Sequence, residues 1–106
     1  PCIIFTHFGL AEDKQIGNYW FEKNPEDGLM NNRQAIKEII KSDDNVIAIF
    51  NGHQHWTKQI IEDGKNYYVV GSLTENIDML GVPDGIYLEV ELEDRKIRIQ
   101  EKHIEI

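Results

Sequence analysis

The amino-acid sequence predicts an α/β fold with a mixed sheet, in which one βαβ crossover is followed by antiparallel strands. Two short apolar runs, at 2–6 and 46–50, have the length of strands, and the segment 31–42 between them has apolar residues at helical spacing. Beyond residue 55 the apolar pattern instead repeats every second residue, as it does in strands. A strand, a helix and a strand in this order form a crossover unit, so the first two strands are expected to be parallel neighbours.

The first strand is expected at 2–6, where Pro1 is tolerated at the outer end. The chain then becomes irregular over 8–31, because glycines and the pairs Asn-Pro and Asp-Gly favour turns. Three consecutive aromatic residues, at 19–21, lie within this segment. Loops of this length inside a compact domain are often lids or binding loops, so we expect the aromatic residues either to cover a site or to pack against the domain.

A helix is expected to start after Asn31 or Asn32, either of which is a suitable N-cap, and to run to about Ser42. The apolar residues that share one face of this helix are expected to pack on the sheet, and these are Ala35, Ile36, Ile39 and Ile40. The charged residues of the helix are expected to face water, and these are Lys37, Glu38 and Lys41.

A hairpin is expected to follow the second strand of the crossover. It joins 57–62 to 65–70 through Asp63 and Gly64, a dipeptide that strongly favours a two-residue hairpin turn. The strands of this hairpin supply the first antiparallel pair of the sheet.

A second hairpin is expected to join 86–92 to 96–106, because alternate residues of the first of these segments are apolar. In the last strand the apolar positions change parity between Ile99 and Ile104. That change predicts either a bulge or an edge strand.

Composition and charge restrict the classes of protein to which the chain can belong. With 106 residues, 41% of them hydrophobic, the range 1–106 is expected to form one domain or one part of a larger domain. The formal net charge of -8 repels polyanions, which disfavours nucleic-acid binding by a basic surface. Membrane insertion is not expected, since no apolar segment approaches the roughly 20 residues that span a bilayer. The single cysteine, Cys2, excludes an internal disulfide and favours a reducing, cytoplasmic location.

Histidine follows each of the two apolar strands of the predicted crossover. His7 follows the first, and His53 and His55 follow the second through Gly52, a residue that permits a tight backbone turn. Because parallel neighbours end at the same edge of a sheet, the three side chains are expected to meet there. Imidazole is the commonest metal ligand in proteins, and three of them can hold zinc, iron, manganese or nickel. His103 stands alone in a charged segment and is expected to have no such role.

At these histidines the sequence resembles the calcineurin-like metallophosphoesterases, whose domain carries an ordered series of motifs. The segment 5–10, FTHFGL, looks like the isolated-histidine motif of the family, and 50–55, FNGHQH, looks like its final Gly-His-x-His motif. The segment 68–73, YVVGSL, is similar to the strand and glycine-serine step that follow in many members. The match covers most of the chain but only the carboxyl-terminal half of the family's αββα sandwich. Pro1 enters an apolar strand directly, which also predicts a piece of a longer protein.

The resemblance implies a fragment of a hydrolase, a metal-dependent phosphoesterase that cleaves small phosphate mono- or diesters. In the family pattern His7 and His53 would bind one divalent metal ion and His55 a second, with manganese, iron or zinc as the ions. The two ions would hold a hydroxide between them for attack on phosphorus. Within this chain the resemblance assigns neither a catalytic acid nor substrate-binding residues.

The earlier motifs of the family are missing from these residues, since Gly-Asp-x-His, Gly-Asp-x-x-Asp and Gly-Asn-His do not occur and no Gly-Asp pair is present. Those motifs supply the bridging aspartate, further carboxylate and asparagine ligands, and the histidine that assists the leaving group. The chain alone is therefore expected to be inactive or nearly so, with the activity in a longer parent protein. Other carboxylates are expected to be solvated charge rather than ligands, and these are Glu12, Asp13, Glu26, Asp27, Glu75 and Asp78.

The residues alone leave two other functions open. The chain could be a complete small domain that binds metal through three histidines and has no phosphoester chemistry. It could also be a catalytically silent module that binds a partner through the aromatic residues at 19–21. Because half of a sandwich exposes apolar sheet surface and strand edges, we also expect the isolated chain to self-associate.

Overall fold

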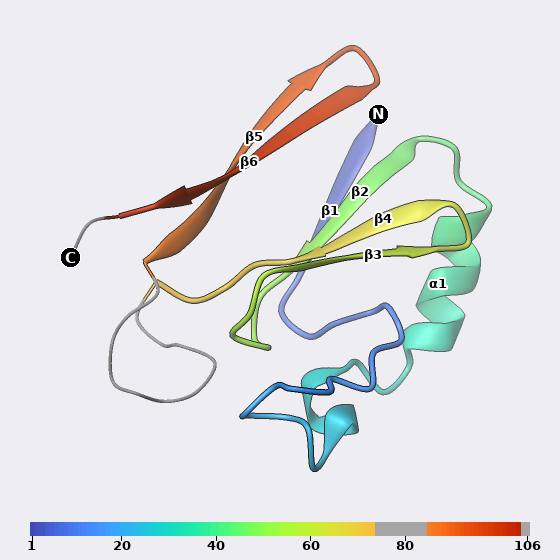
Figure 1. Ribbon diagram of the computed structural model, residues 1–106. Helices are drawn as coiled ribbons and strands as arrows, with labels where there is room; N and C mark the ends of the chain where they lie inside the picture. The colour runs from blue at the N-terminus through green and yellow to red at the C-terminus, as the bar shows by residue number, and fades with distance from the viewer. Residues whose placement is uncertain (74–84, 105–106) are drawn as a thin grey trace.

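The computed structural model describes residues 1–73 and 85–104, which form a four-stranded sheet, a two-stranded sheet, one α-helix and a short 3-10 helix. The strands of the larger sheet are β1 (Cys2–Thr6), β2 (Val46–Asn51), β3 (Lys58–Glu62) and β4 (Lys65–Val69). The other elements are η1 (Pro25–Gly28), α1 (Arg33–Lys41), β5 (Ile86–Glu93) and β6 (Lys96–His103). The larger sheet lies between α1 and the hairpin of β5 and β6 (Figure 1).

The larger sheet is mixed, with the strand order β1-β2-β4-β3. β1 and β2 are parallel, and Thr6 lies opposite Asn51 at the end of their ladder. β2 is also parallel to β4, whereas β3 and β4 are antiparallel and are joined by the turn at Asp63 and Gly64. The predicted α/β class, the crossover and the first hairpin are therefore confirmed. The carboxyl ends of β1, β2 and β4 share one edge of the sheet, which we call the carboxyl edge.

α1 packs against one face of this sheet, and its predicted apolar face is buried only in part, because Ala35 is exposed. Ile40 belongs to the core and Ile36 packs against it, whereas Ile39 is 71% exposed and Lys37 only 4% exposed. The prediction that Lys37 faces water is wrong because its ammonium group lies 2.6 Å from Glu62 Oε1 on β3. The ion pair with Glu62 thus places Lys37 on the buried side of the helix, and Ile39 is exposed to solvent.

The core lies between α1 and the sheet. Its buried members come from the segment after β1, from α1, from β2 and from β4, and they are Leu10, Ala11, Ile40, Val46, Ile49 and Tyr67. Two core residues thus belong to the segment that the sequence predicts to be irregular. The long loop is therefore anchored in the domain at the point where it leaves β1.

β5 and β6 pair without interruption, from Ile86 opposite His103 to Glu93 opposite Lys96. The second hairpin is confirmed, and of the two alternatives for the last strand the edge strand is correct. Ile104 follows the last paired residue, so its change of parity does not disturb the ladder. The end of the predicted strand, at 105–106, lies outside the described residues, as do Glu75 and Asp78.

The face of the larger sheet opposite α1 carries a row of stacked rings. Phe50 on β2 lies between Phe5 on β1 and Tyr68 on β4, with ring centroids 5.5 and 5.1 Å away. The hairpin of β5 and β6 covers this row incompletely, because a cavity of about 350 Å³ lies between the sheet and Leu88 and Val90 of β5. Phe5 is 75% exposed, so β1 presents an apolar side chain at the outer strand of the sheet.

Candidate functional site

Two of the three predicted histidines meet at the carboxyl edge. β1 ends at Thr6 and β2 at Asn51, which lie opposite one another, so the residues that follow the two strands leave the sheet together. His7 and His53 lie just beyond these ends, and the centroids of their rings are 4.7 Å apart. The prediction that both lie at the same end of the sheet is confirmed.

The ring of His53 contacts aromatic side chains and the backbone of the loop. Its centroid lies 4.4 Å from that of Phe8 and 5.1 Å from that of Phe21. Its Nε2 is 3.1 Å from the carbonyl oxygen of Asp27. Because a carbonyl oxygen only accepts, this hydrogen bond requires a proton on Nε2 and leaves the lone pair of a neutral ring on Nδ1. Histidines that bind metal commonly donate their second ring N–H to such an acceptor.

His55 lies in a different aromatic setting. Its ring packs edge to face on Trp20, with centroids 4.9 Å apart. Within residues 1–73 and 85–104, no group of three or more His, Cys, Asp or Glu side chains is arranged to hold a metal ion. The structure therefore pairs His7 with His53 and places His55 against the loop. His103 belongs to β6, where its Nε2 lies 3.2 Å from Glu101.

The turn that carries these histidines is bent at the histidines themselves. His53 and His55 have φ angles of 64° and 59°, in the left-handed region, which costs a residue with a side chain roughly 1–2 kcal/mol. Gly52 was expected to supply the bend, but it has no positive φ, and a Cβ added to it would meet nothing within 4 Å. The expected glycine turn is thus replaced by two strained positions at the candidate ligands, a kind of strain that clusters at functional sites.

Gln54, between the two histidines, points into the protein and is 1% exposed. Its Oε1 accepts a hydrogen bond from Asn51 Nδ2 at 2.8 Å, and its Nε2 donates to Gln15 Oε1 at 3.0 Å. Its backbone carbonyl accepts from Asn18 Nδ2 at 2.8 Å. All four amide side chains are buried. This buried amide network, made by Gln15, Asn18, Asn51 and Gln54, joins the turn to the end of β2 and to the loop.

The network extends to the aromatic residues of the loop. Asn18 Oδ1 accepts hydrogen bonds from the backbone N–H groups of Trp20 and Phe21, at 2.8 and 3.2 Å. Gln15 Nε2 donates to the carbonyl oxygen of Pro25 at 2.7 Å. The amides that hold the histidine turn therefore also hold the backbone of two residues whose rings contact the histidines.

A second cluster, made of charged residues, fastens the loop to α1 and β3. Arg33 donates to both carboxylate oxygens of Glu12, at 2.7 and 3.1 Å, and to both of Glu26, at 2.8 and 2.9 Å. Lys37 lies 2.6 Å from Glu62 and 3.3 Å from Glu12. The hydrogen bond from Arg33 is the main cause that lowers the pKa of Glu12 below its usual value. The same bond raises the pKa of Arg33, so the pair stays charged across the neutral range.

These contacts correct part of the expectation that the loop carboxylates are solvated. Glu12 and Glu26 are exposed but ion-paired, and the side chain of Asp13 is only 5% exposed and lies 3.0 Å from Lys58 Nζ. Asp27 reaches the carboxyl edge through its backbone carbonyl. Among the described residues, no group of three or more His, Cys, Asp or Glu side chains joins these carboxylates to the histidines.

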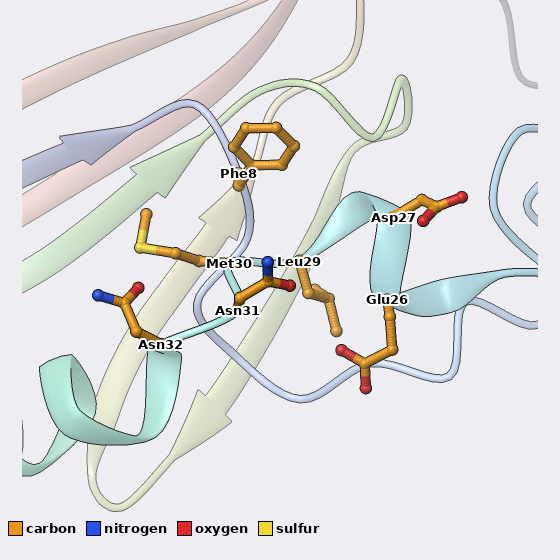
Figure 2. Close-up of a pocket in the computed structure, with 7 residues that line it drawn as sticks. All are labelled: Phe8, Glu26, Asp27, Leu29, Met30, Asn31 and Asn32. Atoms are coloured by element: carbon orange, nitrogen blue, oxygen red, sulfur yellow. The ribbon is translucent and has the colours of Figure 1, made fainter.

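A cavity of about 420 Å³, whose lining residues are drawn in Figure 2, lies next to two residues that contact His53. The residues that line it are Phe8, Glu26, Asp27, Leu29, Met30, Asn31 and Asn32. Phe8 and Asp27 are also the residues that touch His53 by ring and by carbonyl. Figure 2 shows the two carboxylates toward one end of the cavity and Met30 toward the other. A molecule bound there would meet an apolar wall and several oxygen acceptors.

Sequence reasoning missed the buried amide network. Gln15 and Asn18 lie in a segment that reads only as irregular, and nothing in their spacing brings them to Asn51. Gln54 stands between two histidines, but both of these have left-handed φ angles, so the alternation of side chains in an extended strand does not apply to this turn.

Comparison with protein-family models found no match to this chain, and no match was found among curated proteins or among solved structures. In the part of the chain that the structure describes, no helix has the length and apolar character needed to cross a membrane. What the protein does is therefore inferred from its own residues and their geometry.

Proposed function

We propose that this chain is the carboxyl-terminal part of a calcineurin-like metallophosphoesterase, whose parent hydrolyses small phosphate mono- or diesters with two divalent metal ions. The observation that carries the proposal is the pairing of His7 with His53 just beyond two parallel strands, at a ring separation of 4.7 Å. The sequence patterns around these two residues are also the ones that resemble the family's motifs.

The histidines of this chain can supply the imidazole ligands of such a centre. Zinc binds imidazole nitrogen at about 2.0–2.1 Å, so two rings on one such ion must lie side by side, as those of His7 and His53 do. The hydrogen bond from His53 Nε2 to the carbonyl of Asp27 supports the proposal, because it orients the ring and directs Nδ1 as the free donor. His55 would serve the second ion. A metal pair of this kind lowers the pKa of a bridging water and clamps the phosphoryl oxygens.

The carboxylate ligands of the centre would come from the rest of the parent protein. Three carboxylates of the loop that follows His7 are ion-paired, and these are Glu12, Asp13 and Glu26. The isolated chain would consequently bind metal weakly and turn over little substrate. The cavity lined by Phe8 and Asp27 would hold the leaving group of the ester, since both of these residues contact His53.

The test uses the full-length parent with added manganese and p-nitrophenyl phosphate or its diester. His53→Ala and His55→Ala should each lower kcat/KM by more than about 100-fold, because each removes a metal ligand. His103→Ala is the matched control, since His103 is an exposed histidine on the separate hairpin, and it should leave kcat/KM unchanged. Normal turnover with both of the first two changes would show that the histidines have no catalytic role.

A specific observation also favours a binding role for the loop. Tyr19 is 61% exposed and its ring packs edge to face on that of Trp20, and Ile16 on the same loop is 73% exposed. A catalytically silent module would use these side chains for a partner and would need no metal. Elemental analysis separates the candidates, because stoichiometric metal on the purified parent supports the phosphoesterase. Tight metal binding by this chain alone would instead favour a small three-histidine domain.

Self-association of the isolated chain is a further part of the proposal. β1 is the outer strand of the larger sheet, and Phe5 on it is 75% exposed. An open strand edge beside apolar surface is a template for pairing between chains. Phe5→Lys should shift the chain toward monomer in sedimentation equilibrium, whereas Ile39→Lys, at a similarly exposed isoleucine on α1, should not. A chain that is monomeric at high concentration without any change would refute this part.

A further inference from the structure

Gln54 is buried although it lies between His53 and His55 in the turn after β2. His53 and His55 are partly exposed, whereas Gln54 is 1% exposed and its amide uses both of its ends. The oxygen accepts from Asn51 at the end of β2, and the nitrogen donates to Gln15 in the loop. A buried amide that is satisfied on both sides holds one orientation, because any rotation would leave a polar atom without a partner.

The hydrogen bonds of the network run in one direction. Asn51 donates to Gln54, Gln54 donates to Gln15, and Gln15 donates to the carbonyl oxygen of Pro25. Each middle member therefore needs a donor and an acceptor on the same side chain, which an amide supplies and a carboxylate or an ammonium group does not. This order ties the end of β2, the histidine turn and the loop into one unit.

The backbone is fitted closely around the same amides. A Cβ added to Gly9 would lie 2.6 Å from Gln54 Oε1, and one added to Gly28 would lie 2.6 Å from Gln15 Nε2. The segments on both sides of the loop therefore approach the amides more closely than a residue with a side chain allows. The position of Gln54 is fixed by packing as well as by hydrogen bonds.

We propose that Gln54 is a positioning residue, which holds the turn so that His53 faces His7 while His55 faces Trp20. The left-handed backbone at both histidines is the feature that needs such an anchor, because this conformation is unfavourable for residues with a side chain. Asn18 completes the arrangement, since it binds the carbonyl of Gln54 and the backbone of Trp20 with one amide. The role of Gln54 in metal binding rests on the proposed function, but its role in ring placement does not.

The test replaces Gln54 in this chain by methionine, which has a similar length but cannot form either hydrogen bond. Proton NMR should show that contacts between the rings of His7 and His53, and between those of His55 and Trp20, are lost while the variant remains folded by circular dichroism. Binding of Co²⁺, followed by its visible absorption, should weaken by about 10-fold or more, as expected when a group that orients a ligand is removed. Gln100→Met, at an exposed glutamine on β6, should change neither readout.

Unchanged ring contacts in a folded Gln54→Met variant would overturn the inference. If that variant does not fold, the side-chain amide protons of the unaltered chain decide, because those of Gln54 and Asn51 should exchange with solvent at least about 100-fold more slowly than those of Gln100. Equal exchange rates would refute the network. Lost ring contacts together with an inactive, metal-free parent would sustain the positioning role and remove only the phosphoesterase proposal.

Discussion

The buried lysine of α1 leads to the sharpest stability prediction. The side chain of Lys37 is 5% exposed, and that of its partner Glu62 is 25% exposed. Removing one member of a fully buried pair typically costs about 3–5 kcal/mol, because the other charge is left without a counter-ion. Water reaches Glu62 in part and Glu12 more freely, so we expect Lys37→Met to lower the free energy of unfolding by about 2 kcal/mol.

The assay is urea unfolding followed by tryptophan fluorescence. With a slope of about 1–2 kcal/mol per molar urea, the change corresponds to a midpoint lower by about 1–2 M. Lys41→Met is the matched control on the same helix, because Lys41 pairs with Glu38 on the surface at 3.5 Å and should cost less than about 0.5 kcal/mol. Adding Glu62→Gln to Lys37→Met should restore part of the loss, since the stranded carboxylate is then neutral. Equal midpoints for the two lysine variants would refute the reasoning.

Three further predictions concern the loop and the core. Gly9→Ala should lower the free energy of unfolding by about 1–3 kcal/mol, because the new Cβ would lie 2.6 Å from a buried amide oxygen. Gly52→Ala should change it by less than about 1 kcal/mol, because a Cβ there meets nothing within 4 Å, and thermal melts of the two variants side by side check the difference. The hydrogen bond from Arg33 lowers the pKa of Glu12, so this carboxylate stabilises the fold above its unfolded-state pKa of about 4.5, and the stabilisation is lost as the pH falls through the folded-state pKa. Urea unfolding at a series of acidic pH values should therefore show a shallower loss of stability for Glu12→Gln than for the unaltered chain. Burial raises the pKa of Tyr67 above its usual 10.0, so its contribution to stability is fully present below that pH and is lost as the pH rises through the raised pKa. Alkaline unfolding that is the same in Tyr67→Phe as in the unaltered chain would contradict this.

Local patterns were sufficient to predict most of the elements. The strand at 2–6 and the strand at 46–50 were placed almost to the residue, and the helix at 33–41 lies inside its predicted bounds. The hairpin at Asp63 and Gly64 followed from turn chemistry alone. These features are encoded by residues a few positions apart, so they do not depend on what the rest of the chain does.

The details of burial and of the site were not accessible in this way. The inward position of Lys37 depends on Glu62, which is distant in sequence and becomes a neighbour only when β3 lies beside α1. The buried amide network likewise joins Gln15 to Gln54 across 39 positions. A prediction from helical periodicity places every charged residue on the solvent side, because it contains no information about an ion-pair partner that is distant in sequence.

The same division holds at the carboxyl edge. The order of strand, helix and strand was enough to predict that His7 and His53 follow parallel neighbours, because a right-handed crossover leaves few other arrangements. The folded chain alone decided that His55 lies against Trp20, and that the bend falls on two histidines rather than on Gly52. A strand's direction is a property of the backbone path, whereas the direction of a side chain on a turn is set by hydrogen bonds and packing with residues far away in the sequence.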